Sequence, residues 1–339
     1  MTLGRSKLPW NSAKSWAGTT AYAVFGSVGC AVLLLWTAQG SGREYALGFA
    51  IAVSVAAAVL AAALESLPQG LDDNIGVPLI TGLFLYCLLL TQGQGLPWAE
   101  AELWSRLGWA VGVNLALAGL GYAARSVSIS GALAGFLVGT AIYVSLGWRG
   151  YSLLLAFFVL GTAATKLGYQ RKAAQGLAQE GGGRRGVRHA LANTSVAAAC
   201  AFFAIMTPYG GLFVLAFAAA FATKTSDTAA SEIGQLWGKR TFLITSLRPV
   251  PRGTEGAVSL EGTVAGILAS VLVAALGVVV GLYGWSGAAV VVVAAFVGTT
   301  MESLVGATLE KRGLLDNEAV NFLNTLVGAL TAAALYPWI

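Results

Sequence analysis

The stretch ATKTSDTAASEIGQLWGKRTFLITSLRPVPRGTEGAVSLEGT, residues 222–263, is the longest polar segment of an otherwise apolar chain. It holds five of the basic and four of the acidic residues, and apolar sequence flanks it on both sides. Lipid would not accommodate so many charges, and a simple loop would not need them. We expect this stretch to be the reaction centre, held by a membrane scaffold made from the rest of the chain.

The composition supports a membrane scaffold. The chain has 339 residues, of which 57% are hydrophobic and 10% charged, and its mean hydropathy is +0.74. Soluble domains carry about 25% charged residues. The sequence therefore predicts an all-α fold, a polytopic bundle of membrane helices. The three cysteines lie singly in apolar stretches, which excludes a CxxC metal site or a disulfide framework.

Eleven apolar runs are candidates to cross a hydrocarbon core of about 30 Å. They cover residues 17–38, 46–64, 76–92, 106–124, 131–147, 150–165, 190–206, 211–222, 262–283, 286–303 and 319–338. The N-terminal residues are too polar and basic for a cleavable signal peptide, so we expect the first run to be retained.

The distribution of Lys and Arg predicts the orientation. If the N-terminus is cytoplasmic, the inside segments contain seventeen of the twenty Lys and Arg residues. The three exceptions, Arg43, Arg106 and Arg149, fall one each in outside loops, which fits the positive-inside rule. The same rule explains the net charge of +5, so we expect no nucleic-acid partner. The long cytoplasmic loops are expected at 166–189, 223–261 and 304–318.

Two parts of the chain repeat the same order of motifs. Ser15-x-x-Gly18-Thr19 precedes two apolar runs, then Glu65-Ser66 and an Asp-Asn pair, and Ser259-x-x-Gly262-Thr263 precedes a similar series. The first copy has no equivalent of KTSDTAASEIG before it. We therefore expect a non-catalytic piece at 1–95, a connecting span at 96–124 and a catalytic unit at 125–339.

The polar stretch is suited to binding a polyphosphate. Asp227 and Glu232 are acids among Lys and Arg residues and glycines, with Thr225–Thr228 expected to begin a helix. Carboxylates can hold Mg²⁺, cations neutralise phosphates, and glycine allows close backbone approach. No GxxxxGK[ST] motif is present, so this is not a P-loop. Without further information, a capped amphipathic helix explains the pattern equally well.

Three segments closely resemble one membrane enzyme family. They are KTSDTAASEIG (224–234), RPVPRGTEGAVSLEGTVAG (248–266) and FFVLGTAATKLGYQRKAAQG (157–176) with GGRRG (182–186). The family includes the plastid phytyl-phosphate kinase of tocopherol synthesis, and the resemblance covers about residues 125–339. Met301-Glu302-Ser303 departs from it, since many members carry an Asp-Ser pair there. Residues 4–26 and 65–79 resemble instead the C-terminal part of phytol and dolichol kinases.

This resemblance implies a nucleotide-dependent kinase that converts an isoprenyl monophosphate, such as phytyl phosphate, into the diphosphate at the cytoplasmic face. It implies Mg²⁺ and a nucleoside triphosphate, with CTP favoured, in the plasma or thylakoid membrane of a photosynthetic bacterium. The residues that it assigns to catalysis are Asp227, Lys224, Glu232 and Lys166.

The remaining assignments concern ligands. The implied metal ligands are Asp227, Glu232, Glu302 and Asp316, and the implied phosphate-binding residues are Lys239, Arg252, Gly253, Thr254, Ser259, Gly262 and Thr263. Asn317, Asn321 and Asn324 share a helical face and are assigned to the lipid headgroup, although such residues can also simply join helices. His189, the single histidine, receives no role.

Three alternatives stay open. The N-terminal resemblance allows an isoprenoid alcohol kinase, and the polar cytoplasmic pattern allows a CTP-dependent cytidylyltransferase that acts on a lipid phosphate. A transporter ranks last, because its ionisable groups would be expected in mid-membrane, whereas the acids here are expected in loops and at the ends of spans.

Overall fold

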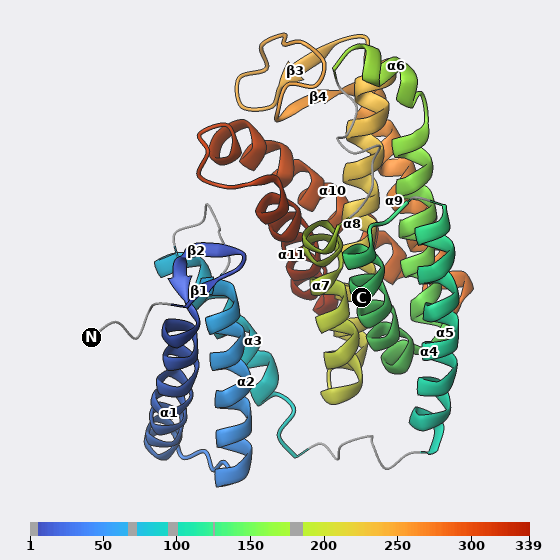
Figure 1. Ribbon diagram of the computed structural model, residues 1–339. Helices are drawn as coiled ribbons and strands as arrows, with labels where there is room; N and C mark the ends of the chain where they lie inside the picture. Colours follow the sequence, from blue (N-terminus) through green and yellow to red (C-terminus); the bar gives the residue numbers. More distant parts are fainter. Residues whose placement is uncertain (1–5, 67–72, 94–100, 125, 177–185) are drawn as a thin grey trace. The chain divides into compact units, whose positions relative to one another are not determined.

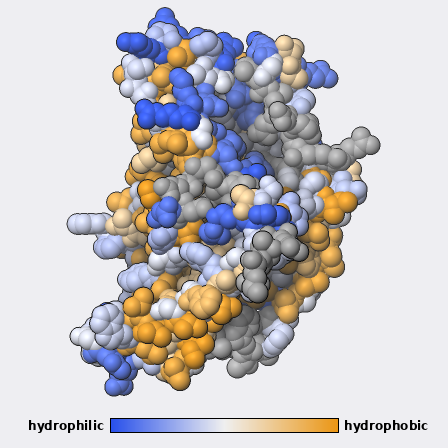
Figure 2. Space-filling model, turned by 60° about the vertical axis from the view of Figure 1, so that its left-hand side comes forward, coloured by the Kyte–Doolittle hydropathy of each residue, from blue (hydrophilic) through white to orange (hydrophobic). Residues whose placement is uncertain are grey.

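The computed structural model describes residues 6–66, 73–93, 101–124, 126–176 and 186–339. Its contacts divide the chain into two compact units, Met1–Gly95 and Leu96–Ile339. The elements are almost all helical (Figure 1). Each of the eleven predicted apolar runs coincides with a helix over most of its length. Large apolar patches lie beside polar areas on the surface seen in Figure 2, and such patches are expected for helices in lipid. The chain is an all-α, multi-pass integral membrane protein.

Unit 1 is a short hairpin followed by three helices. Strands β1 (Lys7–Leu8) and β2 (Asn11–Ser15) pair antiparallel, and α1 (Trp16–Ser41), α2 (Leu47–Ser66) and α3 (Asp73–Leu89) follow. Lys14 at the end of the hairpin forms an ion pair with Glu65 at the end of α2. This ion pair holds the hairpin against α2.

Unit 2 contains the remaining elements. They are α4 (Ala101–Ala123), α5 (Ile129–Lys166), α6 (Tyr169–Ala174), α7 (Val187–Met206), α8 (Gly210–Trp237), β3 (Thr241–Leu243), β4 (Ala257–Ser259), α9 (Leu260–Val279), α10 (Trp285–Val305), the π-helical turn η3 (Gly306–Glu310), α11 (Asn317–Leu335) and a final 3-10 turn, η4 (Tyr336–Trp338). Strands β3 and β4 form an antiparallel hairpin at the same end of unit 2 as α6 (Figure 1).

Helix α5 contains two predicted runs, 131–147 and 150–165, and the helix is interrupted at Gly147, the last residue of the first run. That glycine has φ 62° and ψ −160°, a conformation that glycine adopts readily. The Oδ1 atom of Asn114 accepts a hydrogen bond of 2.7 Å from the Tyr151 hydroxyl and also lies against Gly139. A straight helix would place residues 139 and 151 about 18 Å apart. The chain therefore bends sharply at Gly147 and brings the two halves of α5 together.

Among the described residues, seven helices are long and apolar enough to cross a membrane, and Asn74–Leu89 is a shorter apolar helix. Helices α4 and α8 are not among the seven, and α5 is counted once. The number of eleven spans and the cytoplasmic N-terminus thus remain predictions.

Helix α8 is the centre of unit 2. Every residue from Leu215 to Thr228 is buried, and α8 packs against α5, α7, α9, α10 and α11. Stacked rings of Phe157 and Phe221, 5.4 Å apart, join it to α5. The prediction that a loop begins at residue 223 is wrong, because α8 continues as one helix to Trp237. Its polar half is enclosed by other helices instead of lipid, which the composition of the segment alone does not reveal.

Glycines allow α8 to approach its neighbours closely. A Cβ atom at Gly262 of α9 would lie 2.5 Å from the Ala230 carbonyl oxygen of α8, and one at Gly266 would lie 2.9 Å from that of Ser226. On α10, a Cβ atom at Gly298 would lie 2.5 Å from the Thr223 side chain. These contacts leave no space for side chains and fix the backbone of α8 where its charged residues lie.

Candidate functional site

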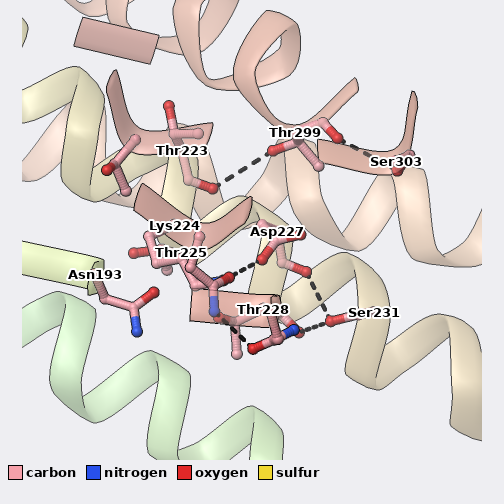
Figure 3. Close-up of polar contacts among 12 residues, drawn as sticks. Asn193, Thr223, Lys224, Thr225, Asp227, Thr228, Ser231, Thr299 and Ser303 are labelled. Carbon is pink, nitrogen blue, oxygen red and sulfur yellow. Dashed lines mark hydrogen bonds and ion pairs between the residues drawn. The ribbon is translucent and has the colours of Figure 1, made fainter. Parts of the chain in front are cut away.

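The polar half of α8 presents Lys224 and Asp227 one helical turn apart. The Lys224 ammonium forms an ion pair with the Asp227 carboxylate, and both side chains are more than nine-tenths buried (Figure 3). Lys224 also donates a hydrogen bond to Asn321 Oδ1 of α11, and Asn321 Nδ2 donates to Asn317 Oδ1 at 2.9 Å. Opposite charges stabilise each other strongly where water is excluded. The expected helix entry at Thr225–Thr228 is wrong, because these residues lie within α8.

Helix α10 brings further polar residues to the same place. Thr299 Oγ1 donates to the Thr223 carbonyl oxygen at 3.4 Å, and Ser303 Oγ donates to the Thr299 carbonyl oxygen at 3.3 Å (Figure 3). Glu302 precedes Ser303 on α10, and its carboxyl group lies close to the carboxyl group of Asp227. Two carboxylates this close repel each other unless a proton or a cation lies between them.

These residues line a cavity of about 1060 Å³. Its walls come from the start of α5, the start of α7, the polar half of α8, the turn at Gly253–Gly256, the start of α9, the ends of α10 and η3, and the start of α11. Five carboxylates of the described residues line it: Asp227, Glu255, Glu302, Glu310 and Glu318. The cations on the described part of its wall are Lys224 and Arg188, with His189 a third if it is protonated. The cavity is therefore rich in acids and can attract a cation.

The start of α9 forms one edge of the cavity. Ser259 is the N-cap residue, and its Oγ accepts a hydrogen bond of 3.1 Å from the Gly262 backbone N–H. Ser15 caps α1 in the same way, with Gly18 as the donor at 3.2 Å. The backbone angles of the two serines also agree, at φ −135° and ψ 155° for Ser259 and φ −134° and ψ 152° for Ser15. The repeated motif thus has the same local structure in both units.

Sequence comparison places this cavity within a known family. Residues 112–329 match the family described as integral membrane protein DUF92. The chain belongs to the DUF92 family. The matched residues run from α4 to α11 and include the whole polar half of α8, so the cavity lies in the part that characterises the family. The expected membership of a membrane protein family with a plant plastid relative is confirmed.

Several curated relatives are similar over much of this DUF92 protein. An uncharacterized membrane protein of Synechocystis is 45% identical over 59% of this chain and 79% of its own length. The chloroplastic protein VTE6 of Arabidopsis thaliana is 39% identical over 76% of this chain and 78% of its own. An uncharacterized membrane protein of Methanocaldococcus jannaschii is 31% identical over 62% and 87%. No solved structure matches the chain.

The cavity brings together part of the predicted site. Asp227, Lys224 and Glu302 meet as described, and further predicted residues line the wall: Gly253, Thr254, Ser259, Gly262, Thr263, Asn317 and Asn321. Gly262, however, packs against α8, and its N–H is already bonded to Ser259. The local geometry therefore does not support a phosphate-binding role for the Gly262 N–H, because the Ser259 cap already accepts its hydrogen bond.

Other predicted residues lie elsewhere in this DUF92 protein. Glu232 forms a buried ion pair with Lys172 of α6, and Asp316 caps α11 and accepts a hydrogen bond of 2.6 Å from Arg188. Asn324 is fully buried in the helix core. Lys166, Lys239 and Arg252 are not part of the cavity wall. The expected set of four metal-binding carboxylates is therefore not assembled, because Glu232 and Asp316 are not part of the cavity wall, whereas Asp227 and Glu302 are.

The structure adds residues that the sequence did not single out. Arg188 and His189 begin α7 and line the cavity, with His189 Nδ1 3.7 Å from Glu318 Oε2. Their position directly after a glycine-rich loop with two further arginines was the available signal. Residues 177–185, which include these two arginines, lie outside the described residues.

The described residues could hold a magnesium ion only together with ligands from the substrate and water. Among the described residues, no three His, Cys, Asp or Glu side chains are close enough to hold a metal ion by themselves. Mg²⁺ in phosphate-transfer sites is usually bound by one or two carboxylates together with substrate phosphates and water. The close pair Asp227 and Glu302 fits that smaller requirement, and their mutual repulsion would be relieved by a cation between them.

The placement of these acids changes one earlier argument. A transporter was ranked last because the acids were expected in loops, but Lys224 and Asp227 are buried within a helix. Both residues nevertheless open onto a cavity that the β3–β4 hairpin and the loops of one end also line. The group therefore lies in a cavity that the β3–β4 hairpin and neighbouring loops also line, and not among helices alone.

Proposed function

We propose that the cavity of unit 2 is the active site of an isoprenyl-phosphate kinase, which transfers the γ-phosphoryl group of a nucleoside triphosphate to phytyl phosphate or a similar lipid. The observation that carries the proposal is the buried ion pair of Lys224 and Asp227 with the Glu302 carboxyl group beside it, placed in a large cavity among membrane helices. Its support from relatives is the similarity to the chloroplastic plant protein VTE6 and the family resemblance of its motifs.

The chemistry requires little acid–base catalysis. An oxygen of the lipid phosphate, already anionic at neutral pH, attacks the γ-phosphorus, and the bond from that phosphorus to the β,γ-bridging oxygen breaks. The nucleoside diphosphate leaves with that oxygen. The main barrier is repulsion among the phosphates, so charge neutralisation and alignment dominate.

The described residues can meet this requirement. The Lys224 ammonium, held by Asp227 and Asn321, would neutralise one phosphate at a fixed position. Arg188 and the Gly253–Gly256 turn lie on the cavity wall, where they could contact the nucleotide. Asp227 and Glu302 would hold Mg²⁺, which would supply further charge neutralisation when bound with the nucleotide. We place this site at the cytoplasmic face, where nucleotides are available, and favour CTP as the donor.

A product assay tests the proposal. The purified full-length protein in lipid nanodiscs would receive Mg²⁺, phytyl phosphate and one of CTP, ATP, UTP or GTP labelled at the γ-phosphate. We expect labelled phytyl diphosphate with at least one nucleotide, and no product at all would refute the proposal. Phytol as acceptor tests the alcohol kinase, and release of pyrophosphate would identify a cytidylyltransferase.

One substitution ties activity to the site. Asp227→Asn keeps the size of the side chain but removes the charge, so we expect diphosphate formation to fall at least a hundredfold while the protein still folds. Glu261→Gln is the matched control, because Glu261 lies in the first turn of α9 and is not part of the cavity wall. Full activity of Asp227→Asn would remove this residue from the mechanism.

A further inference from the structure

Two large apolar side chains of the cavity wall come from helices α9 and α10. Ile267 of α9 and Phe296 of α10 both line the cavity, yet their exposed fractions are 37% and 48%. The charged side chains of the same cavity are different, since Lys224 and Asp227 are almost completely buried. Two partly exposed apolar side chains thus lie in the wall of a cavity whose charged residues are buried, and a lateral opening to the outside of the helix bundle would lie beside them.

This opening lies within the depth of the membrane. Both α9 and α10 belong to the helices that are long and apolar enough to span a bilayer. Phe296 precedes Glu302 by six residues and Ile267 follows the start of α9 by seven, so each lies about 9–11 Å along its helix from the polar end. That distance is about a third of a hydrocarbon core.

The surroundings of the opening are apolar. Val264 and Leu268 on α9 and Val293 and Val297 on α10 are exposed beside it. Small residues occupy the opposite, buried faces of the two helices, where α8 packs. A charged headgroup would not enter from the lipid side, whereas a hydrocarbon chain could lie across the opening without losing contact with lipid.

We infer that the isoprenyl chain of the lipid substrate leaves the cavity through this opening, and that Ile267 and Phe296 determine which chains are accepted. This inference rests on the proposed function. Its energetic reason is that removing a chain from lipid into water costs about 0.8 kcal/mol for each CH₂ group. A lateral opening avoids most of that cost, because the phosphate reaches Lys224 while the chain stays in the bilayer.

Photolabelling tests the opening without requiring turnover. The probe is a C20 isoprenyl monophosphate with a diazirine in its second isoprene unit, added to the full-length protein in nanodiscs. We expect peptide mapping to find the label within 264–268 and 293–300. An excess of phytyl phosphate during irradiation should prevent this labelling. Free phytol, which has no phosphate, should compete poorly. Label distributed over many lipid-facing helices would refute the inference.

A substitution tests specificity. Phe296→Trp would narrow the opening, so we expect KM for a C20 acceptor to rise about tenfold, while a C5 acceptor, too short to reach Phe296, is used as before. Val293→Trp is the matched control, because Val293 is exposed on α10 but is not part of the cavity wall. Equal effects of Phe296→Trp on both acceptors would contradict the inference.

The two experiments separate the two ideas. Labelling at 264–268 and 293–300 without diphosphate formation would retain the opening and refute the kinase. Diphosphate formation with the label elsewhere would retain the kinase and refute the opening.

Discussion

The ion pair between Lys172 and Glu232 offers a direct test of how the site is built. Their side chains are only 1% and 5% exposed. The Lys172 ammonium also donates to the carbonyl oxygens of Thr165 at 3.0 Å and Ala164 at 3.5 Å, near the end of α5. Lys172 thus joins α5, α6 and α8.

Replacing Lys172 with Met would leave the Glu232 carboxylate buried without a cation. Removal of one partner from a buried pair costs about 3–5 kcal/mol, because the desolvated charge that remains is uncompensated. The other Glu232 oxygen, Oε1, already has no hydrogen-bond partner within the described part of the chain, so nothing nearby would take over. The double variant Lys172→Met, Glu232→Leu removes both charges, and we expect it to recover most of the lost stability.

The assay is unfolding of the purified protein by SDS, followed by circular dichroism, with diphosphate formation measured on the same samples. We expect activity to follow stability, so that the double variant is active although Glu232 is absent. A metal ligand could not be rescued in this way. A stable double variant without activity would refute the structural role and restore Glu232 as a functional residue.

Two further substitutions address the packing and the metal site. Gly266→Ala would place a Cβ atom 2.9 Å from the Ser226 carbonyl oxygen, so we expect a loss of about 1–3 kcal/mol on SDS unfolding; Gly135→Ala, where nothing lies within 4 Å, is the control and should not destabilise. Asp316→Ala removes the cap of α11, so about 1 kcal/mol should be lost. The Mg²⁺ concentration needed for half-maximal activity should be unchanged, and a large increase would show that Asp316 binds the metal.

The sequence was a reliable guide to the helices. Each predicted apolar run is helical over most of its length, because an apolar segment in lipid must satisfy its backbone groups within itself. The break at Gly147 also falls at the end of a predicted run, 131–147. The length of α8 could not be predicted from the composition, since Lys224 to Glu232 contains as many polar residues as a loop. The helices that enclose this segment are distant in the sequence.

The site was predictable where a residue acts through its own segment. Asp227 and Lys224 share one turn of α8, so their proximity follows from the helix itself. Partners from other helices could not be ranked in this way. The resemblance assigns Lys166 to catalysis and gives no role to Lys172, six residues later. Nothing in the sequence shows that α6 folds back against α8 and buries Lys172.

The charged half of α8 has a consequence for how the protein enters the membrane. A charged residue in mid-helix opposes insertion by about 2.5–3.5 kcal/mol, and α8 carries Lys224, Asp227 and Glu232. Three of the helices that pack against α8 follow it in the sequence and are synthesised later, namely α9, α10 and α11. We therefore expect the insertion of α8 into the membrane to be delayed at the translocon until α9, α10 and α11 have been synthesised. Glycosylation mapping of chains truncated after Trp237 would detect the delay, and full insertion of such chains would exclude it.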